Sequence, residues 1–249
     1  MQCPKAILFD LDETLAESFQ PLESDMLVRL NKLASVRPVA IISGAGFARI
    51  EQNVLSRLPD AGRLYLFPNS STQCYTFKNG TWEMEYNLAL TESEREHIRG
   101  ALSEALEEMP LLKGTTSYGI QISDREAQVA FTAVGLDAPA EVKAGWDPDK
   151  FKRRAIIEYL QKKIPDFDIL IGGASTIDVT HKGINKAHGV EWLANHLQVP
   201  LQEMLYVGDA VYPGGNDEVV IPTGIETRAV AGPEDTLKII DELLVACTT

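Results

Sequence analysis

The chain opens with a short apolar run that ends in two carboxylates. Residues 6–9 (Ala-Ile-Leu-Phe) precede Asp10-Leu11-Asp12, a length and boundary typical of a buried parallel strand. In open α/β sheets, chemistry occurs just beyond the carboxyl ends of the strands, so the pattern predicts one loop holding Asp10 and Asp12. Two negative charges at such a short distance repel one another, so the loop needs a cation, a shared proton or both. An Asp-x-Asp also occurs in ordinary surface turns, and this stretch alone leaves both interpretations open.

Length and charge limit the classes of protein that this chain can be. Its 249 residues, 45% of them hydrophobic, suffice for one large domain or two modest ones. The net charge of −13 and the lack of a Lys/Arg cluster argue against nucleic acid as a partner. No amino-terminal signal stretch and no long apolar run occurs, so we expect a soluble cytoplasmic protein that binds no membrane.

The cysteines and histidines give no metal or disulfide pattern. Cys3, Cys74 and Cys247 lie far apart in the sequence without a Cys-x-x-Cys pair, which fits a reducing compartment. Of the four histidines, only His181 and His188 are near one another, so zinc spacing is absent.

Apolar periodicity predicts a β-α-β-α start. Residues 22–34 have helical spacing, and residues 39–42 form a second buried strand. A helical stripe over residues 47–58 ends at Pro59, and residues 64–67 form a third strand. Asn79-Gly80, between the runs 74–77 and 81–86, predicts a hairpin.

A different order of helices and strands follows, and after it the alternating β-α order returns. Thr91 and Glu94 form a capping box that opens a helix up to Pro110. Next we expect strands near 119–123 and 127–134, a helix over 148–163, and strands near 168–172 and 176–180. The α/β rhythm then resumes with a helix over 185–197, strands at 204–207 and 225–230, and a helix over 233–245. We therefore expect an α/β fold, a Rossmann-like parallel sheet core (1–82 and 184–249) with an inserted α+β unit (83–183).

The second strand ends in Ser43-Gly44-Ala45-Gly46. A dinucleotide fingerprint is excluded because Arg49 stands where the third small residue belongs, and no Gly-Lys-Ser/Thr ending supports a Walker loop. A serine hydroxyl beside flexible backbone amides suits one phosphate, which makes Ser43 and Gly44 candidate binding residues. A helix cap is an equally good interpretation of Ser43.

The resumed core repeats the opening pattern. The strand at 204–207 leads to Gly208-Asp209, and Gly214-Gly215-Asn216-Asp217 follows in a short loop. Lys186 supplies a positive charge at a helix start. One sheet edge would then gather Asp10, Asp12, Asp209 and Asp217 around a hard divalent cation, with Ser43 and Lys186 holding an anion. Taken singly, Lys186 also fits a solvated helix residue and Asp217 a helix N-cap.

In this order, the motifs resemble those of the haloacid dehalogenase superfamily, in the subclass with a large inserted α+β cap (subclass IIB). Its four motifs match Asp10-Leu11-Asp12-Glu13-Thr14, Ser43, Lys186, and Gly208-Asp209 with Asn216-Asp217. Within the superfamily, residues 208–217 and 233–236 look like eukaryotic-type phosphomannomutase.

The resemblance implies a phosphoryl-transfer enzyme that uses Mg²⁺. Asp10 would be the nucleophile that forms an aspartyl phosphate, and Asp12 the general acid and then base. The metal would be held by Asp10, the backbone carbonyl of Asp12, and Asp209, with Asp217 as a ligand or a support. Ser43 and Lys186 would stabilise the transferring oxygens.

The cap residues bear on whether water or a sugar accepts the phosphoryl group. Arg125 fits a phosphate-binding arginine of the family, while Lys143 replaces a second one. Thr176 and Asp178 match sugar-contacting positions. On its own, Arg125 is equally consistent with a solvated strand residue.

Two positions favour hydrolysis over a mutase. Leu136 and Phe19 stand where the family has basic side chains, and a bisphosphate intermediate needs charge at both ends. Ser43-Gly44 also looks more like the sugar phosphatases of the subclass. We expect a phosphatase of phosphorylated sugars, with phosphomannomutase as the alternative.

A non-catalytic binding protein of this fold is the third hypothesis. Its best argument is Glu13, because the family usually has Gly there and a side chain adds strain or another carboxylate. The expected partner is a small phosphorylated sugar. The oligomeric state stays open, with a homodimer through the cap as one candidate.

Overall fold

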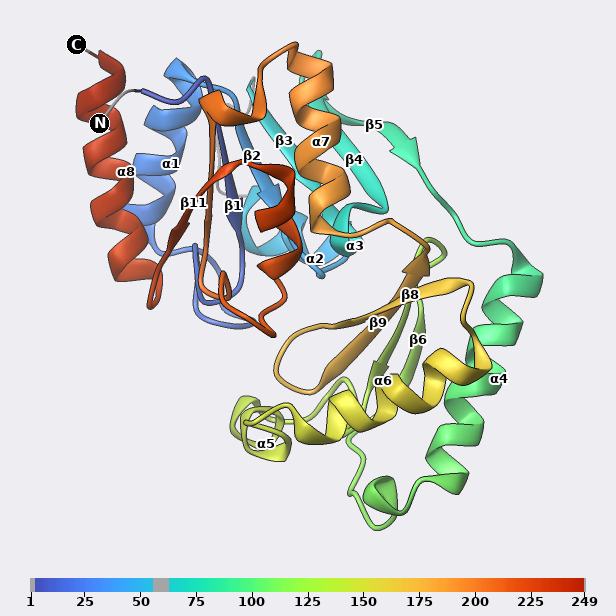
Figure 1. Cartoon of the computed structure of the whole chain (residues 1–249). Coiled ribbons are helices and arrows are strands. Elements are labelled where there is room, and N and C mark those ends of the chain that lie inside the picture. The colour runs from blue at the N-terminus through green and yellow to red at the C-terminus, as the bar shows by residue number, and fades with distance from the viewer. Residues whose placement is uncertain (1–2, 56–62, 249) are drawn as a thin grey trace. The chain divides into compact units, whose positions relative to one another are not determined.

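The computed structural model describes residues 3–55 and 63–248 and divides into two compact units. The first comprises Met1–Asn87 and Asn185–Thr249, and the second Leu88–Ile184 (Figure 1). The sequence placed a boundary near residue 82, which falls inside strand β5 (Thr81–Asn87). The first unit extends to Asn87 because β5 pairs along its length with β4 (Gln73–Lys78).

The first unit is built on a seven-stranded sheet in the order β11-β10-β1-β2-β3-β4-β5. Five strands run parallel, and β4 and β5 add an antiparallel edge. The parallel strands are β1 (Ala6–Asp10), β2 (Val39–Ile42), β3 (Leu64–Phe67), β10 (Met204–Gly208) and β11 (Glu226–Ala229). This arrangement confirms the predicted α/β fold with a mostly parallel sheet.

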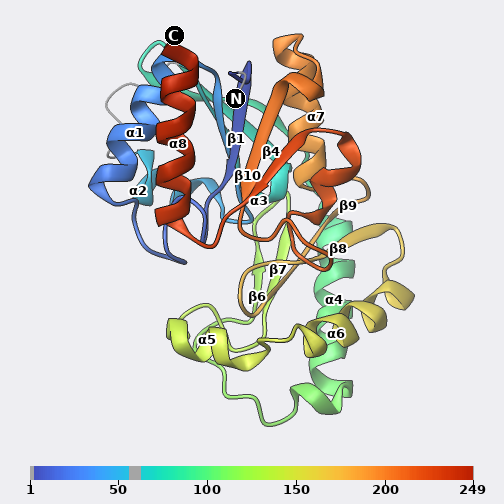
Figure 2. The same ribbon diagram turned by 60° about the vertical axis from the view of Figure 1, so that its left-hand side comes forward.

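Helices cover both faces of this sheet because its central strands are apolar on both sides. Ile7 and Phe9 of β1 pack with α1 and α8, whereas Ala6 and Leu8 pack with α7. Figures 1 and 2 show α1 and α8 together on one face and α7 on the other. The helices are α1 (Ser24–Val36), α2 (Phe47–Asn53), α3 (Pro68–Ser71), α7 (Lys186–Leu197) and α8 (Pro233–Thr248), with 3₁₀ turns η3 (Leu201–Glu203) and η4 (Glu218–Thr223).

The expected helix over residues 47–58 is shorter in the structure. Helix α2 ends at Asn53. The predicted end at Leu58 and Pro59 lies outside the described residues.

The second unit contains a four-stranded sheet in the order β6-β7-β9-β8, antiparallel throughout. Its strands are β6 (Ile122–Asp124), β7 (Val129–Thr132), β8 (Phe167–Ile171) and β9 (Thr176–His181). Its helices are α4 (Glu92–Glu108), α5 (Ala140–Trp146) and α6 (Phe151–Lys163), with the 3₁₀ turn η2 (Pro110–Leu112). The sequence predicted one helix over 148–163, so α5 was missed.

One face of this second sheet is apolar and the other polar. Phe131 and Val179 pack with Ile98 of α4 and Ile156 of α6. Because successive strand residues point to opposite faces, Asp178 lies on the face away from that core.

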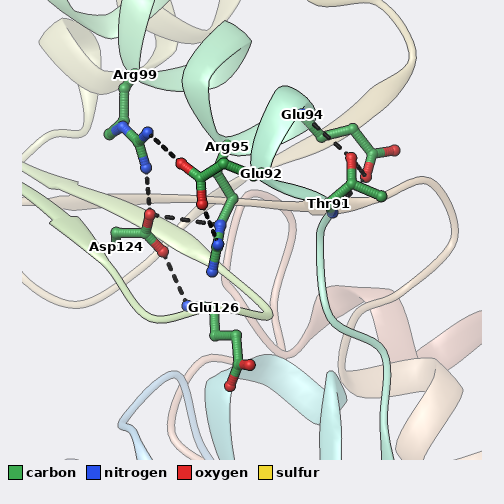
Figure 3. Close-up of polar contacts among 7 residues, drawn as sticks. All are labelled: Thr91, Glu92, Glu94, Arg95, Arg99, Asp124 and Glu126. Atoms are coloured by element: carbon green, nitrogen blue, oxygen red, sulfur yellow. Dashed lines mark hydrogen bonds and ion pairs between the residues drawn. The ribbon is translucent and has the colours of Figure 1, made fainter.

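A network of charges ties the start of α4 to the β6–β7 hairpin (Figure 3). Thr91 and Glu94 make the predicted capping box. Arg99 pairs with Glu92 at 2.9 Å and with Asp124. The other oxygen of Asp124 accepts the backbone N–H of Glu126 at 2.9 Å. The two oxygens of Asp124 therefore join α4 to the hairpin turn that carries Arg125.

A disulfide joins Cys3 to Cys247, with their Cα atoms 5.1 Å apart. The spacing of the cysteines, which on its own fits a reducing compartment, does not reveal this bridge, because a separation of 244 residues does not report distance in space. Cys3 precedes the central strand β1, and α8 brings Cys247 next to Cys3. Cys74 is buried and unbridged. Among the described residues, no helix is long and apolar enough to cross a bilayer.

Candidate active site

A buried lysine bridges two carboxylates at one edge of the first unit's sheet. Asp10 is the last residue of β1, and Lys186 is the first residue of α7. The Lys186 ammonium donates to Asp10 Oδ1 at 2.7 Å and to Asp217 Oδ1 at 2.6 Å. Each of the three residues is at most 4% exposed. Lys186 is therefore not a solvated helix residue.

Burial and charge act against one another in this cluster. Burial raises the pKa of Asp10 well above its usual value, with Lys186 opposing the rise and Asp217 adding to it. Burial alone would lower the pKa of Lys186, but Asp10 and Asp217 raise it above the ordinary value. The lysine consequently remains a cation in the interior.

Asp209 adds a third carboxylate. Oxygen atoms of Asp10, Asp209 and Asp217 lie within 4.8 Å of one another. Burial and the neighbouring Asp217 raise the pKa of Asp209. Crowded carboxylate oxygens of this kind are the ligands that hard divalent cations prefer, and the repulsion among them is relieved by such a cation.

Asp217 is fixed by its surroundings. It stands at the N-cap position of η4, but its side chain makes no capping hydrogen bond there. Its carboxylate instead accepts the Tyr206 hydroxyl at 2.5 Å and the Ala210 N–H at 3.2 Å. A Cβ added at Gly208 would lie 2.3 Å from Asp217 Oδ2, so only glycine fits there.

Asp12 lies apart from the buried cluster. Its side chain is 28% exposed, and Oδ1 accepts the Phe19 N–H at 3.2 Å and a bond from Arg49 of α2. The same loop is joined to the end of β10, because Thr14 Oγ1 accepts the Asp209 N–H at 3.0 Å.

Glu13 has a local structural role. Its φ of 58° lies in the left-handed region, which favours glycine. Its carboxylate accepts the Ser18 N–H at 2.9 Å, and its own N–H donates to the Ala16 carbonyl at 2.7 Å. The side chain thus closes the loop, and its carboxylate is not part of the acidic cluster.

Ser43 is buried at the end of β2. Its hydroxyl oxygen accepts the Ala45 N–H at 3.0 Å. The N-cap of α2 is Gly46, so the helix-cap interpretation of Ser43 is wrong. A hydroxyl that accepts one bond retains its own hydrogen to donate to an anion. Gly44, next in the chain, is partly exposed.

A strained segment that the sequence did not reveal supports this loop. Asn69, Ser70 and Ser71 follow β3 with φ values of 49°, 56° and 72°, and all three are buried. The Ser70 N–H donates to the Ser43 carbonyl at 2.8 Å, and the Asn69 N–H donates to the Ala45 carbonyl at 2.9 Å. Strain of this kind persists where the surroundings enforce it, often at functional sites.

The second unit holds the remaining candidates. Thr176 and Asp178 share the polar face of β9, and Asp178 is 2% exposed. Arg125 lies in the β6–β7 turn, where its N–H donates to the Gln128 carbonyl at 2.8 Å. Lys143 is 7% exposed, and its ammonium donates to the Leu136 carbonyl at 2.7 Å. The ammonium is thus directed to the backbone of Leu136.

Known proteins similar to this chain agree with the geometry. The family model described as eukaryotic phosphomannomutase matches residues 26–246. The chain belongs to this family. A phosphomannomutase of Spinacia oleracea is 25% identical over 96% of this chain and 95% of its own length. Human phosphomannomutase 1 is 23% identical over 93% of this chain and 88% of its own.

Solved structures support the fold. The C-terminal domain of Candida albicans trehalose-6-phosphate phosphatase has a TM-score of 0.68 at 18% identity, covering 96% of this chain and 92% of that one. IMP-bound Plasmodium falciparum IMP-nucleotidase has a TM-score of 0.72 at 17% identity, covering 98% of this chain and 68% of that one. The resemblance to the haloacid dehalogenase superfamily is confirmed. This chain is an enzyme of the phosphohydrolase or mutase type.

Three residues at the site were missed by sequence reasoning. Thr14 stands within the recognised first motif, but its role depends on a bond to a loop 195 residues away. Tyr206 was assigned only as an apolar strand residue, although a buried Tyr hydroxyl usually needs a partner. Arg49 was noted only as a mismatch to a glycine pattern. Its position in the first turn after the Ser43 loop was the available signal.

Proposed function

We propose that this protein is a Mg²⁺-dependent phosphatase of phosphorylated sugars that works through an aspartyl phosphate on Asp10. The observation that carries the proposal is the buried cluster in which Lys186 bridges Asp10 and Asp217 beside Asp209. A carboxylate fixed at a strand end by an ammonium is oriented for attack on phosphorus.

Each residue of the first unit has a distinct part. Asp10 attacks, and Lys186 with the Ser43 hydroxyl and the Gly44 amide stabilises the transferring oxygens. Asp12 gives a proton to the leaving oxygen and then takes one from water. Asp10, Asp209, Asp217 and the backbone carbonyl of Asp12 would hold Mg²⁺, which neutralises the repulsion between carboxylate and phosphate.

The second unit supplies the sugar-binding residues in this proposal. Thr176 and Asp178 would contact hydroxyl groups, and Arg125 a phosphate. Hydrolysis is supported by the position of Lys143, whose ammonium is buried against the Leu136 carbonyl. A mutase must hold a bisphosphate at both ends, and Leu136 and Lys143 provide little accessible charge for this.

Phosphomannomutase activity is the second candidate. It is favoured by the family model and by the names of the curated relatives. A non-catalytic role is the third candidate, but the cluster of charged groups that phosphoryl transfer requires supports the catalytic proposals over it.

A panel of phosphorylated sugars, assayed with Mg²⁺ for both phosphate release and isomerisation, tests the proposal. We expect steady phosphate release that needs no added sugar bisphosphate. Isomerisation that depends on glucose 1,6-bisphosphate would favour the mutase instead. A chain inactive toward every sugar phosphate and toward a generic phosphomonoester would favour the binding role.

The cytoplasmic location and a homodimer through the second unit remain predictions of the sequence. The disulfide between Cys3 and Cys247 removes the cysteine argument for a reducing compartment. Gel filtration with light scattering tests the oligomeric state.

A further inference from the structure

The disulfide between Cys3 and Cys247 lies at the opposite end of the first unit's sheet from the acidic cluster. Cys3 precedes the amino end of β1, whereas Asp10 of the cluster is the last residue of that strand. Both cysteines are partly exposed. Small molecules in solution can therefore meet the bridge without entering the candidate active site, and the proposed phosphoryl transfer does not use it.

One of the two sulfur atoms lies against a cation. Arg37, the C-cap residue of α1, donates its Nε–H to Cys3 Sγ at 3.1 Å. The same Nε–H is shared with the Pro4 carbonyl at 3.2 Å, and Nη1 donates to the Val36 carbonyl at 2.8 Å, so the guanidinium is fixed in place. The Pro4 oxygen lies 3.3 Å from the sulfur, but its partial charge is smaller than the full charge of the guanidinium. Arg37 therefore stabilises a thiolate at Cys3.

The other sulfur atom has a different electrostatic environment. Cys247 lies in the last turn of α8, and this turn contains no basic residue. The carbonyl groups at the carboxyl end of a helix present partial negative charge, which disfavours an anion there. A thiolate is consequently more stable at Cys3 than at Cys247, although the two sulfurs form one bond.

Thiol–disulfide exchange depends on this difference between the two sulfurs. A thiolate that attacks one sulfur expels the other as a thiolate, and the thiolate that is better stabilised leaves faster. Attack on Cys247 expels Cys3, whose charge is met by Arg37. Attack on Cys3 would expel Cys247 at the negative end of α8. The bridge should therefore open in one direction, with the incoming thiol on Cys247.

We propose that Cys247 is a site of reversible modification by small thiols, with Cys3 as the sulfur that leaves and Arg37 as the residue that stabilises it. The thiolate of the small molecule forms a bond to Cys247 Sγ, the bond between the two Sγ atoms breaks, and its electron pair stays on Cys3 Sγ. A second small thiol then attacks the mixed disulfide. It releases Cys247 as a thiol, and the two small molecules leave as their own disulfide, oxidised by two electrons.

The modified chain keeps its fold because α8 is also held by packing and charge. Ile240 and Leu243 of α8 are fully buried in the core that includes α1. Arg29 of α1 donates to Asp241 of α8 at 2.8 Å. Modification opens a link between residues 244 positions apart and so lowers the resistance to unfolding. It is independent of the proposed phosphatase activity.

The first measurement uses the wild-type chain, bridged with oxidised glutathione, freed of it and mixed with reduced glutathione. Early samples are quenched with N-ethylmaleimide, and mass spectrometry of peptides locates the glutathione. We expect Cys247 to carry it about 3- to 10-fold more often than Cys3, the effect of a charged hydrogen bond expressed by about half in the rate. Equal labelling, labelling mainly on Cys3, or a chain that forms no bridge would each overturn the proposal.

The second measurement changes the cation beside Cys3. Arg37→Gln removes the charge and keeps an amide donor, so the bridge should open about 3- to 10-fold more slowly and the glutathione should divide more evenly between the cysteines. Arg37→Lys retains the charge and should recover most of the preference for Cys247. A purely structural role of Arg37 would not change this division, so an unaltered preference in Arg37→Gln would overturn the role of the guanidinium.

Arg63→Gln is the matched control. Arg63 is exposed and donates to the same Val36 carbonyl at 3.3 Å. Among the contacts of the described residues, the hydrogen bond to Cys3 Sγ comes from Arg37. The Arg63→Gln chain should open at the wild-type rate with glutathione on Cys247. Equal effects of the two substitutions would mean that the overall charge of this end of the sheet, rather than Arg37, sets the direction, which contradicts the proposal.

Discussion

The ammonium of Lys186 donates a 2.7 Å hydrogen bond to the carboxylate of Asp10, and both groups are almost fully buried. The two residues are 176 positions apart in the sequence. The contact fixes the first turn of α7 to the end of β1. In the proposed function, Lys186 therefore combines a catalytic role with this structural one.

Replacing Lys186 by Met should therefore reduce both activity and stability. The change leaves Asp10 and Asp217 buried without their counterion, and breaking a buried pair in this way costs about 3–5 kcal/mol. Urea denaturation measures the loss. Lys78→Met is the control, because the Lys78 side chain is 48% exposed and its pair with Glu85 is screened by solvent, so its loss should change stability much less. Similar small losses in both variants would contradict the burial argument.

Glu13→Gly should leave the Mg²⁺ dependence of turnover unchanged. The Glu13 carboxylate binds the Ser18 N–H and lies outside the acidic cluster. Glycine relieves the left-handed strain while losing that hydrogen bond, so we also expect little net change in stability. Metal titrations of activity provide the measurement. A loss of about 10-fold or more in apparent Mg²⁺ affinity, typical of residues that support a metal, would be inconsistent with this interpretation.

Gly189→Ala should destabilise the protein although alanine is the better helix former. An added Cβ would lie 2.4 Å from Ser71 Oγ, within the strained segment that supports the Ser43 loop. Overpacking of this kind costs about 1–3 kcal/mol. Thermal and urea unfolding measure the effect, and adding Ser71→Gly should restore stability.

The control for this substitution is Gly100→Ala in α4. Nothing lies within 4 Å of a Cβ added at Gly100, so that change should be neutral or stabilising by up to about 1 kcal/mol. A stabilised Gly189→Ala would show that α7 and the Ser71 segment are not packed as described.

The sequence identified the residues on the sheet edge because each follows an apolar run or opens a helix. Asp10 ends β1 and Asp209 directly follows β10, and the strand periodicity alone placed them at one edge. Helix α5 was missed because its seven residues span only two turns and offer too short a pattern.

Individual side-chain contacts were beyond sequence reasoning. Arg49 reaches Asp12, and the Lys143 ammonium turns to the Leu136 carbonyl, through side-chain directions that no periodicity encodes. The resemblance predicted that Lys143 binds substrate, but it could not report burial. Glu13 was unexplained until its φ and its bond to Ser18 were known.

The disulfide was also invisible to sequence reasoning, and its removal is testable. Cys3→Ser should lower the free energy of unfolding by about 2–5 kcal/mol, because the bridge closes a very long loop. Cys247→Ser should have the same effect, and the double variant should add nothing further. Additive losses, or no response of the wild type to reducing agent, would argue against a bridge in solution.

The central claim is that Asp10 accepts the phosphoryl group. The most direct measurement is phosphate release from phosphorylated sugars with Mg²⁺ by the wild type and by Asp10→Asn, with thermal unfolding of both as a control for folding. The account predicts turnover in the wild type and none in a folded Asp10→Asn variant. Turnover retained by that variant would contradict it.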